Sequence, residues 1–147
     1  MAKVYILNGP NLNLLGRRNP AVYGTKSMEQ VMIDIQRRWP GTVFSYKQSN
    51  HEGDLIDWLQ QLAKEGDCLG TVLNAGGYAH TSVALRDAVE YIQEQAIPVV
   101  NVHISDIHAR EPFRNTDLLT DVCARTIIGH GTDGYEEAVE HILAISR

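Results

Sequence analysis

The sequence is poor in cysteine and lacks any long apolar run, and each absence excludes a class of protein. Cys68 and Cys123 are the only cysteines among 147 residues, which excludes a disulfide framework; we interpret both as buried free thiols in a reducing compartment. No segment approaches the roughly 20 apolar residues of a membrane span, and the apolar stretch Val4 to Leu7 is too short for a signal-peptide core. We therefore expect a soluble, cytoplasmic protein.

Positive charge is also scarce, which argues against several kinds of partner. The formal net charge is -5, and the 13 lysines and arginines form no long basic run. Non-specific binding to nucleic acid or to an anionic membrane surface depends on such a run or on a basic patch. We therefore expect a small-molecule ligand, no nucleic acid and no membrane partner.

What the chain does contain is a regular alternation of apolar runs and helix-period segments. Turn or capping residues stand at each junction, as in βαβ units that wind a parallel sheet. With 44% hydrophobic residues, the pattern predicts a single domain over residues 1–147, an α/β fold with a flavodoxin-like doubly wound sheet of five parallel strands. The expected strands are residues 3–7, 42–47, 68–73, 98–103 and 125–129.

Capping residues mark where the helices are expected to begin and end. Ser27-Met28-Glu29-Gln30 has the form of a capping box, and Trp39-Pro40-Gly41 ends the helix that it opens. Thr81 or Ser82 can cap a later helix, and a last helix follows Thr132-Asp133. Helices at these places fit the crossovers of a doubly wound sheet.

The longest irregular stretch, residues 8–26, is too polar for a purely structural loop. It contains Asn8-Gly9-Pro10-Asn11-Leu12-Asn13-Leu14-Leu15-Gly16-Arg17-Arg18, and Tyr23-Gly24 follows. Tyrosine has an unperturbed pKa of about 10, but guanidinium charge beside a phenol favours the phenolate and makes proton abstraction possible near neutral pH. Arg17 and Arg18 are the candidates to supply that charge. We interpret the stretch as an active-site lid.

The block from Asn8 to Gly24 resembles the signature of the type II 3-dehydroquinate dehydratases. Residues 74–87 and 102–114 resemble the rest of that family's site, and the similarity, which includes residues 48–53, runs over nearly the full chain. The resemblance implies a lyase, without cofactor or metal, that dehydrates 3-dehydroquinate to 3-dehydroshikimate through an enolate. This reaction serves aromatic amino acid biosynthesis in the shikimate pathway and also quinate breakdown, and the sequence does not decide between them.

The resemblance assigns catalytic roles to individual positions. Tyr23 matches the tyrosine that removes a proton from the carbon beside the substrate ketone, and Arg18 matches the arginine that keeps it ionised, with Arg110 as a second support. Asn11 matches the residue that positions a water against the enolate oxygen, although loop asparagines also bond loop backbone. His103 matches the acid that protonates the departing hydroxyl.

The resemblance also assigns the substrate-binding residues. In the second block, a glycine pair between a strand and a helix leaves backbone N–H groups free to bind an anion, although asparagine and histidine there could equally cap the helix. An acidic residue at the position of Asp87 reaches a neighbouring subunit's site, in trimers that assemble as a dodecamer. The implied substrate-binding residues are Asn74, Gly77, His80, Asp87, Ile104, Ser105 and Arg114.

Three alternative interpretations compete with this one. His103, Asp106 and His108 could suggest a metal site, but no helical HExxH or paired-cysteine spacing accompanies them. Residues 129–134 spell GxGxxG, yet no strand or suitably spaced acidic residue follows, so we expect them to close a turn into the last helix. A flavodoxin-like module that binds FMN or a nucleotide through the same loops stays open.

One departure from the family pattern concerns the proposed acid. The position two before His103, usually a glutamate in the family, is Asn101 here. A neutral amide can orient an imidazole, but it cannot stabilise the protonated ring as a carboxylate does. From the sequence we therefore expect His103 to lack the carboxylate partner that supports this acid elsewhere in the family.

Overall fold

In the computed structural model, which describes residues 2–146, five parallel strands form one sheet in the order β2-β1-β3-β4-β5. This order confirms the predicted flavodoxin-like fold, and every predicted strand boundary lies within one residue of the observed one. The strands are β1 (Lys3–Asn8), β2 (Val43–Gln48), β3 (Cys68–Asn74), β4 (Val99–His103) and β5 (Arg125–Ile128).

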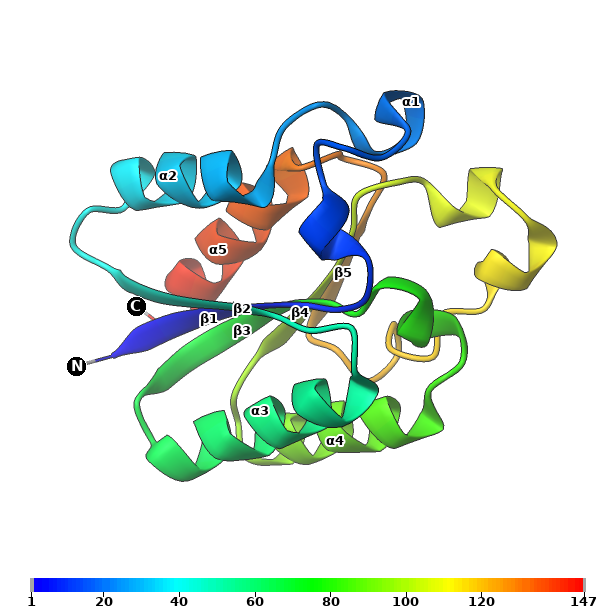
Figure 1. The fold of residues 1–147 in the computed structure, drawn as a ribbon. Coiled ribbons are helices and arrows are strands. Elements are labelled where there is room, and N and C mark those ends of the chain that lie inside the picture. The colour runs from blue at the N-terminus through cyan, green and yellow to red at the C-terminus, as the bar shows by residue number, and fades with distance from the viewer. Residues whose placement is uncertain (1, 147) are drawn as a thin grey trace.

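Helices cover both faces of the sheet, with α2 and α5 on one side and α3 and α4 on the other (Figure 1). The period-2 alternation of β1 explains the two cores, because Val4 and Ile6 pack under α2 and α5 whereas Tyr5 and Leu7 pack against α3 and α4. The helices are α1 (Pro20–Tyr23), α2 (Met28–Arg38), α3 (Glu52–Glu65), α4 (Val83–Glu94) and α5 (Asp133–Ile145), joined by short 3-10 turns at Leu12–Leu14, Gly76–His80, Ile107–Ala109 and Pro112–Asn115.

The predicted capping residues begin the helices as expected. The Gln30 N–H donates to Ser27 Oγ at 3.2 Å, and the Leu85 N–H donates to Ser82 Oγ at 2.9 Å, so Ser82 rather than Thr81 caps α4. Each bond satisfies one amide that the first turn of a helix leaves unpaired. The sequence therefore predicted these two helix starts from local chemistry alone.

Both cysteines are free, as expected, but they are less buried than the sequence predicted. Cys68 and Cys123 are half-buried within the described chain. Desolvation raises the pKa of the Cys68 thiol to about 11 and that of Cys123 to about 12, so both stay protonated at neutral pH.

Among residues 2–146, the helices are too short or too polar to cross a bilayer.

The order of the strands brings the polar loops together at one end of the sheet, opposite the chain termini (Figure 1). The segments after β1 and β3 meet at the point where the strand order reverses. There the Gly9 N–H donates to the Asn74 carbonyl at 2.7 Å, and a Cβ on Gly9 would lie 2.6 Å from the Ala75 carbonyl oxygen. Only glycine permits this approach, which fixes where the lid leaves the sheet.

Candidate active site

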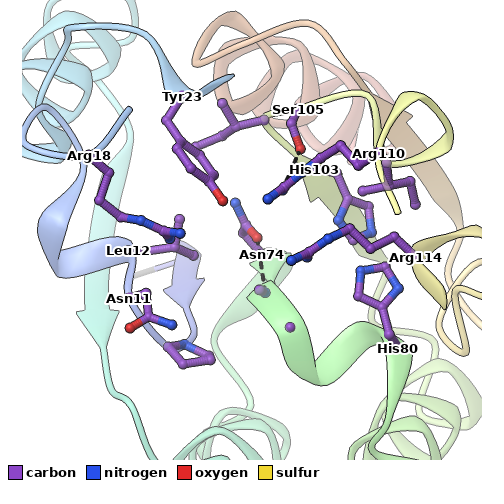
Figure 2. A pocket seen from close by; sticks show the side chains of 15 residues that line it. Asn11, Leu12, Arg18, Tyr23, Asn74, His80, His103, Ser105, Arg110 and Arg114 are labelled. Atoms are coloured by element: carbon purple, nitrogen blue, oxygen red, sulfur yellow. Dashed lines mark hydrogen bonds between the residues drawn. The ribbon is translucent and has the colours of Figure 1, made fainter. Parts of the chain in front are cut away.

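A pocket at this end of the sheet collects the residues that the sequence singled out (Figure 2). Its walls come from the segment after β1, the turn after β3 and the segment after β4, as expected for ligands outside the carboxyl ends of parallel strands. Every predicted site residue except Asp87 lines it. These residues are Asn11, Arg18, Tyr23, Asn74, Gly77, His80, His103, Ile104, Ser105, Arg110 and Arg114.

The candidate base sits at the end of α1, under two guanidinium groups. Arg18 Cζ lies 4.3 Å from the centroid of the Tyr23 ring and Arg110 Cζ lies 5.5 Å from it. Both guanidinium groups lie within cation–π range of the ring, so the phenol is placed in positively charged surroundings. Asn19 stabilises the first turn of the helix that carries Tyr23, because its Oδ1 accepts the Ala21 N–H at 3.2 Å. Of the two candidate arginines, Arg18 lines the pocket and Arg17 is solvent-exposed.

Side chains of the β4–β5 connection hold the other two pocket arginines. Arg110 Nη1 donates to Ser105 Oγ at 3.2 Å, and Arg114 Nε donates to Glu111 Oε2 at 2.9 Å. The hydrogen bond from Arg114 lowers the pKa of Glu111, which keeps that pair ionised. The pocket therefore presents positive charge on both the lid side and the β4 side, which suits an anionic ligand.

The candidate acid lies at the end of β4 and is much more enclosed than the base. The His103 side chain is 5% exposed, and its Nε2 lies 2.8 Å from Asp117 Oδ2. The ring of His80 stacks against it with centroids 5.9 Å apart, and His80 Nδ1 donates to the Thr116 carbonyl at 2.7 Å. Both imidazoles therefore have one nitrogen fixed by the segment that precedes β5.

The expectation that His103 lacks a carboxylate partner was wrong. Asn101 contacts Asp117 instead of the imidazole, since Asn101 Nδ2 donates to Asp117 Oδ2 at 2.8 Å. Burial by itself raises the pKa of Asp117, but hydrogen bonds and charge from His103, with bonds from the Leu119 N–H and Asn101, outweigh it and hold that pKa at about 2. Asp117 is thus ionised, and local sequence around His103 gave no signal of it.

A second residue that sequence reasoning missed, Tyr135, fixes the predicted ligand contact Asn74. Asn74 Nδ2 donates to the Tyr135 hydroxyl at 2.9 Å, that hydroxyl donates to Asn8 Oδ1 at 2.8 Å, and the Gly76 N–H donates to Asn74 Oδ1 at 3.1 Å. Asn8 and Asn74 are paired at the ends of β1 and β3. The fully buried Tyr135 on α5 therefore locks both strand ends in one arrangement.

Comparisons with known proteins show the family of the chain. The family model described as dehydroquinase class II matches residues 2–143. The chain belongs to this family. A 3-dehydroquinate dehydratase from an Exiguobacterium species is 49% identical over 142 residues, which cover 96% of this chain and 94% of that protein. The 3-dehydroquinate dehydratase of a Chelativorans species is 46% identical over 147 residues, 98% of this chain and 99% of that one.

Solved structures give the same answer at the level of the fold. The type II dehydroquinase of Butyrivibrio crossotus superposes with a TM-score of 0.90 at 36% identity, covering 97% of each chain. Membership of the class II dehydroquinases accounts for a pocket built on strand ends at the reversal of a doubly wound sheet. It does not favour the alternative of a flavodoxin-like nucleotide module.

Two predicted features lie outside the pocket of this class II dehydroquinase. Asp87 is on α4, and the pocket of a single chain does not include it. The GxGxxG segment closes the turn into α5, with positive φ angles of 80° at Gly129 and 62° at Gly131. Their N–H groups donate to the carbonyls of His103 at 3.1 Å and Ile104 at 3.0 Å, so the turn supports the strand end that carries the acid.

The residues considered for a metal site have other partners. His103 bonds to Asp117, and Asp106 Oδ1 accepts the His108 N–H at 3.0 Å, which begins a 3-10 turn. Within residues 2–146, the His, Cys, Asp and Glu side chains do not gather in threes that could hold an ion. The side chains of His103 and Asp106 are therefore engaged in hydrogen bonds of the pocket and the loop.

Proposed function

We propose that this protein removes water from 3-dehydroquinate to give 3-dehydroshikimate, with Tyr23 as the base and His103 as the acid. The observation that supports this most directly is the pocket itself, in which a phenol under guanidinium charge and an imidazole bound to a carboxylate face one small space (Figure 2). Elimination of water beside a ketone needs one group of each kind.

In the proposed reaction, the Tyr23 phenolate takes a proton from the carbon next to the ketone. The electrons of that C–H bond form an enolate, whose negative charge develops on the former ketone oxygen. Asn11, at the pocket edge, holds a water against that oxygen, which lowers the barrier because the contact strengthens as charge develops. The enolate then collapses, the C–O bond breaks, and His103 gives a proton to the departing hydroxyl.

The other pocket residues bind the substrate in this proposal. The backbone N–H groups of Ile104 and Ser105, with Asn74, hold the carboxylate of dehydroquinate, and Gly77 lets the turn after β3 approach it closely. His80 and Arg114 bond ring hydroxyls. Their fixed partners, described above, keep these donors in place before the ligand arrives, which reduces the entropy lost on binding.

We further propose that the enzyme works in the cytoplasm as a dodecamer of four trimers, in the shikimate pathway. The position of Asp87 on α4, outside the pocket of its own chain, is compatible with a contact to a neighbouring subunit's pocket. Sedimentation velocity tests the assembly, and activity of Asp87→Ala tests the contact. A monomer with full activity would contradict both parts of this assembly proposal.

An ultraviolet assay tests the reaction, because dehydration produces a conjugated enone that absorbs where dehydroquinate does not. Purified enzyme mixed with 3-dehydroquinate should give a growing enone absorbance. The rival function, binding of FMN or a nucleotide, predicts a purified protein that retains such a ligand and forms no enone. Absorbance spectra of the purified protein, before and after addition of dehydroquinate, separate the two.

A further inference from the structure

The partner of His103 lies outside the three blocks that resemble the family's site, three residues after the last of them ends. Asp117 lies in the segment before β5, 14 positions after His103, and its side chain is 5% exposed. It is held from three sides. The Leu119 N–H donates to Oδ1 at 2.9 Å, while Asn101 Nδ2 and His103 Nε2 both lie 2.8 Å from Oδ2.

The orientation of the Asn101 amide shows that it is adapted to a carboxylate. Asn101 is fully buried, its Nδ2 faces Asp117, and the same nitrogen lies 3.4 Å from Thr126 Oγ1. Its Oδ1, in contrast, is buried and has no hydrogen-bond partner among the described residues. Leaving a buried acceptor unpaired lowers the stability of the fold. The amide of Asn101 therefore leaves its oxygen without a hydrogen bond while its nitrogen donates to Asp117.

We propose that Asp117 is a positioning residue for the dehydration, which supplies the negative charge that holds His103 as its active imidazolium, and that Asn101 holds Asp117 in place. In this chain Asn101 stands where the family usually has a glutamate, and the carboxylate beside the ring is that of Asp117. This inference rests on the proposed role of His103 as the acid.

The protonation state of the His103 ring explains why a carboxylate beside it matters for the reaction. With Nε2 directed at Asp117, only Nδ1 is left to serve the substrate. A neutral ring that donates from Nε2–H has no proton on Nδ1, so it cannot protonate a departing hydroxyl. His103 must therefore be doubly protonated before it acts. An ionised Asp117 favours that state, as a neutral amide does not.

Other charges around His103 set the background for this effect. The guanidinium groups of Arg110 and Arg114 share the pocket with His103 and oppose a second proton on its ring, as does a protonated His80. On the loop side, the Asp121 carboxylate and the Cys123 thiol interact electrostatically with the charge of Asp117. Asp117 is the carboxylate in direct contact with the ring, so it offsets the pocket's positive charge.

The test compares the wild type with Asp117→Asn and with Asn101→Glu/Asp117→Asn. Asparagine at position 117 keeps an oxygen for the Leu119 N–H but removes the charge. In this variant the protonation midpoint of His103, followed by NMR of its imidazole, should fall by about 1 to 3 pH units. The basic limb of kcat/KM should fall with it, so activity at pH 8 drops about ten- to a thousandfold and the loss shrinks at lower pH.

The double variant returns a carboxylate to the position that the family usually uses. A glutamate side chain at position 101 is long enough to approach the ring, and the amide introduced at position 117 can donate to it. Both the midpoint and the basic limb should move back toward the wild-type values. Asn101→Glu by itself sets a second carboxylate against Asp117, so this substitution should help only in the Asp117→Asn background.

Asp121→Asn is the matched control, because Asp121 lies on the same segment but pairs with Arg86 in solvent. Because this carboxylate does not contact the ring, the substitution should move the midpoint and the limb far less than Asp117→Asn does. If Asp117→Asn does not fold, Asp117→Ser, whose hydroxyl can accept the same Leu119 N–H, carries the same expectation.

The inference would be overturned if Asp117→Asn moved neither the protonation midpoint of His103 nor the basic limb of kcat/KM. It would also be overturned if Asn101→Glu/Asp117→Asn restored neither of them. Failure of the proposed function is distinct from both. In that case the wild type would form no enone from dehydroquinate, whatever the NMR titration of His103 shows.

Discussion

The two halves of the pocket are built in opposite ways. On the β4 side, His103 is buried and its partners are fixed by short hydrogen bonds through Asp117 and Asn101. On the lid side, Tyr23 is half-buried on a four-residue helix, and its contacts with Arg18 and Arg110 are stacking contacts of 4.3 and 5.5 Å to its ring. The acid is held by the fold, whereas the base is held by a loop.

This difference follows from how the sheet presents each segment. The acid stands on the last residue of β4, which lies between β3 and β5 in the sheet, so its position is set by the core. The base follows a loop that leaves β1 at Gly9 and returns only at α2. Few-contact segments of this kind open and close most readily, which suits a lid that admits substrate. We expect substitutions on the two sides to have different signatures.

The largest effect should come from removing the base on the lid side. Tyr23→Phe deletes the phenol oxygen and keeps the ring that packs under Arg18, so turnover should fall by about two to four orders of magnitude, roughly 3 to 5 kcal/mol in barrier. Because the fold does not depend on this hydroxyl, ligand affinity and the unfolding midpoint should stay near wild type. Enone assays, calorimetric titration with a product analogue and urea denaturation check the three expectations.

On the buried side, a comparable loss of one hydroxyl should damage stability as well. Tyr135→Phe leaves Asn8 Oδ1 and Asn74 Nδ2 buried without their shared partner. Each unpaired buried group costs about 1 to 3 kcal/mol, so we expect the free energy of unfolding to drop by about 2 kcal/mol or more. KM for dehydroquinate should rise because Asn74 loses its fixed orientation.

Urea denaturation and steady-state kinetics measure these two changes. Tyr91→Phe is the matched control, because Tyr91 lies 46% exposed on α4, away from the pocket, and its loss should change neither value. An unchanged unfolding midpoint in Tyr135→Phe would mean that the strand ends do not need this hydroxyl, and the contrast between the two halves would fail.

A smaller effect is expected from Arg18, which acts on the base only through charge. Arg18→Met keeps much of the side-chain volume but removes the guanidinium above the ring, so the phenolate should form at higher pH. The ascending limb of the pH profile should move up by about 1 pH unit, with a roughly tenfold loss of kcat/KM at neutral pH. Arg17→Met, which removes an exposed charge one residue away, is the control and should leave the limb in place.

The sequence predicted best what depends on local pattern. Strand and helix starts followed from periodicity and caps such as Ser27, and the pocket residues followed from three polar blocks placed at strand ends. It failed where the decisive contact is non-local. Asp117 and Tyr135 come from segments with no local motif, and only the packing of β5 and α5 beside β3 and β4 brings them to His103 and Asn74.

That failure also explains the one expectation that was wrong. Inferring the role of Asn101 from its position two before His103 assumes that neighbours on a strand contact each other. In the folded chain the amide faces Asp117, and the charge arrives from a loop. The carboxylate beside His103 therefore comes from a position that the residues around His103 in the sequence do not point to.

A reagent that reduces imines should have no effect, which makes this the smallest change we expect. Neither half of the pocket contains a lysine that could form an imine with the substrate. Lys3, Lys26, Lys47 and Lys64 all lie outside the pocket lining. An enolate mechanism forms no imine, so borohydride added with dehydroquinate should neither reduce activity nor attach ligand to the protein. Intact-mass spectrometry after treatment, with a residual enone assay, makes the measurement. A lysine-linked adduct with a matching loss of activity would show that an amine, and not the phenolate of Tyr23, is the reacting group. The contrast between an acid held by the fold and a base carried by a loop would then no longer describe the reaction.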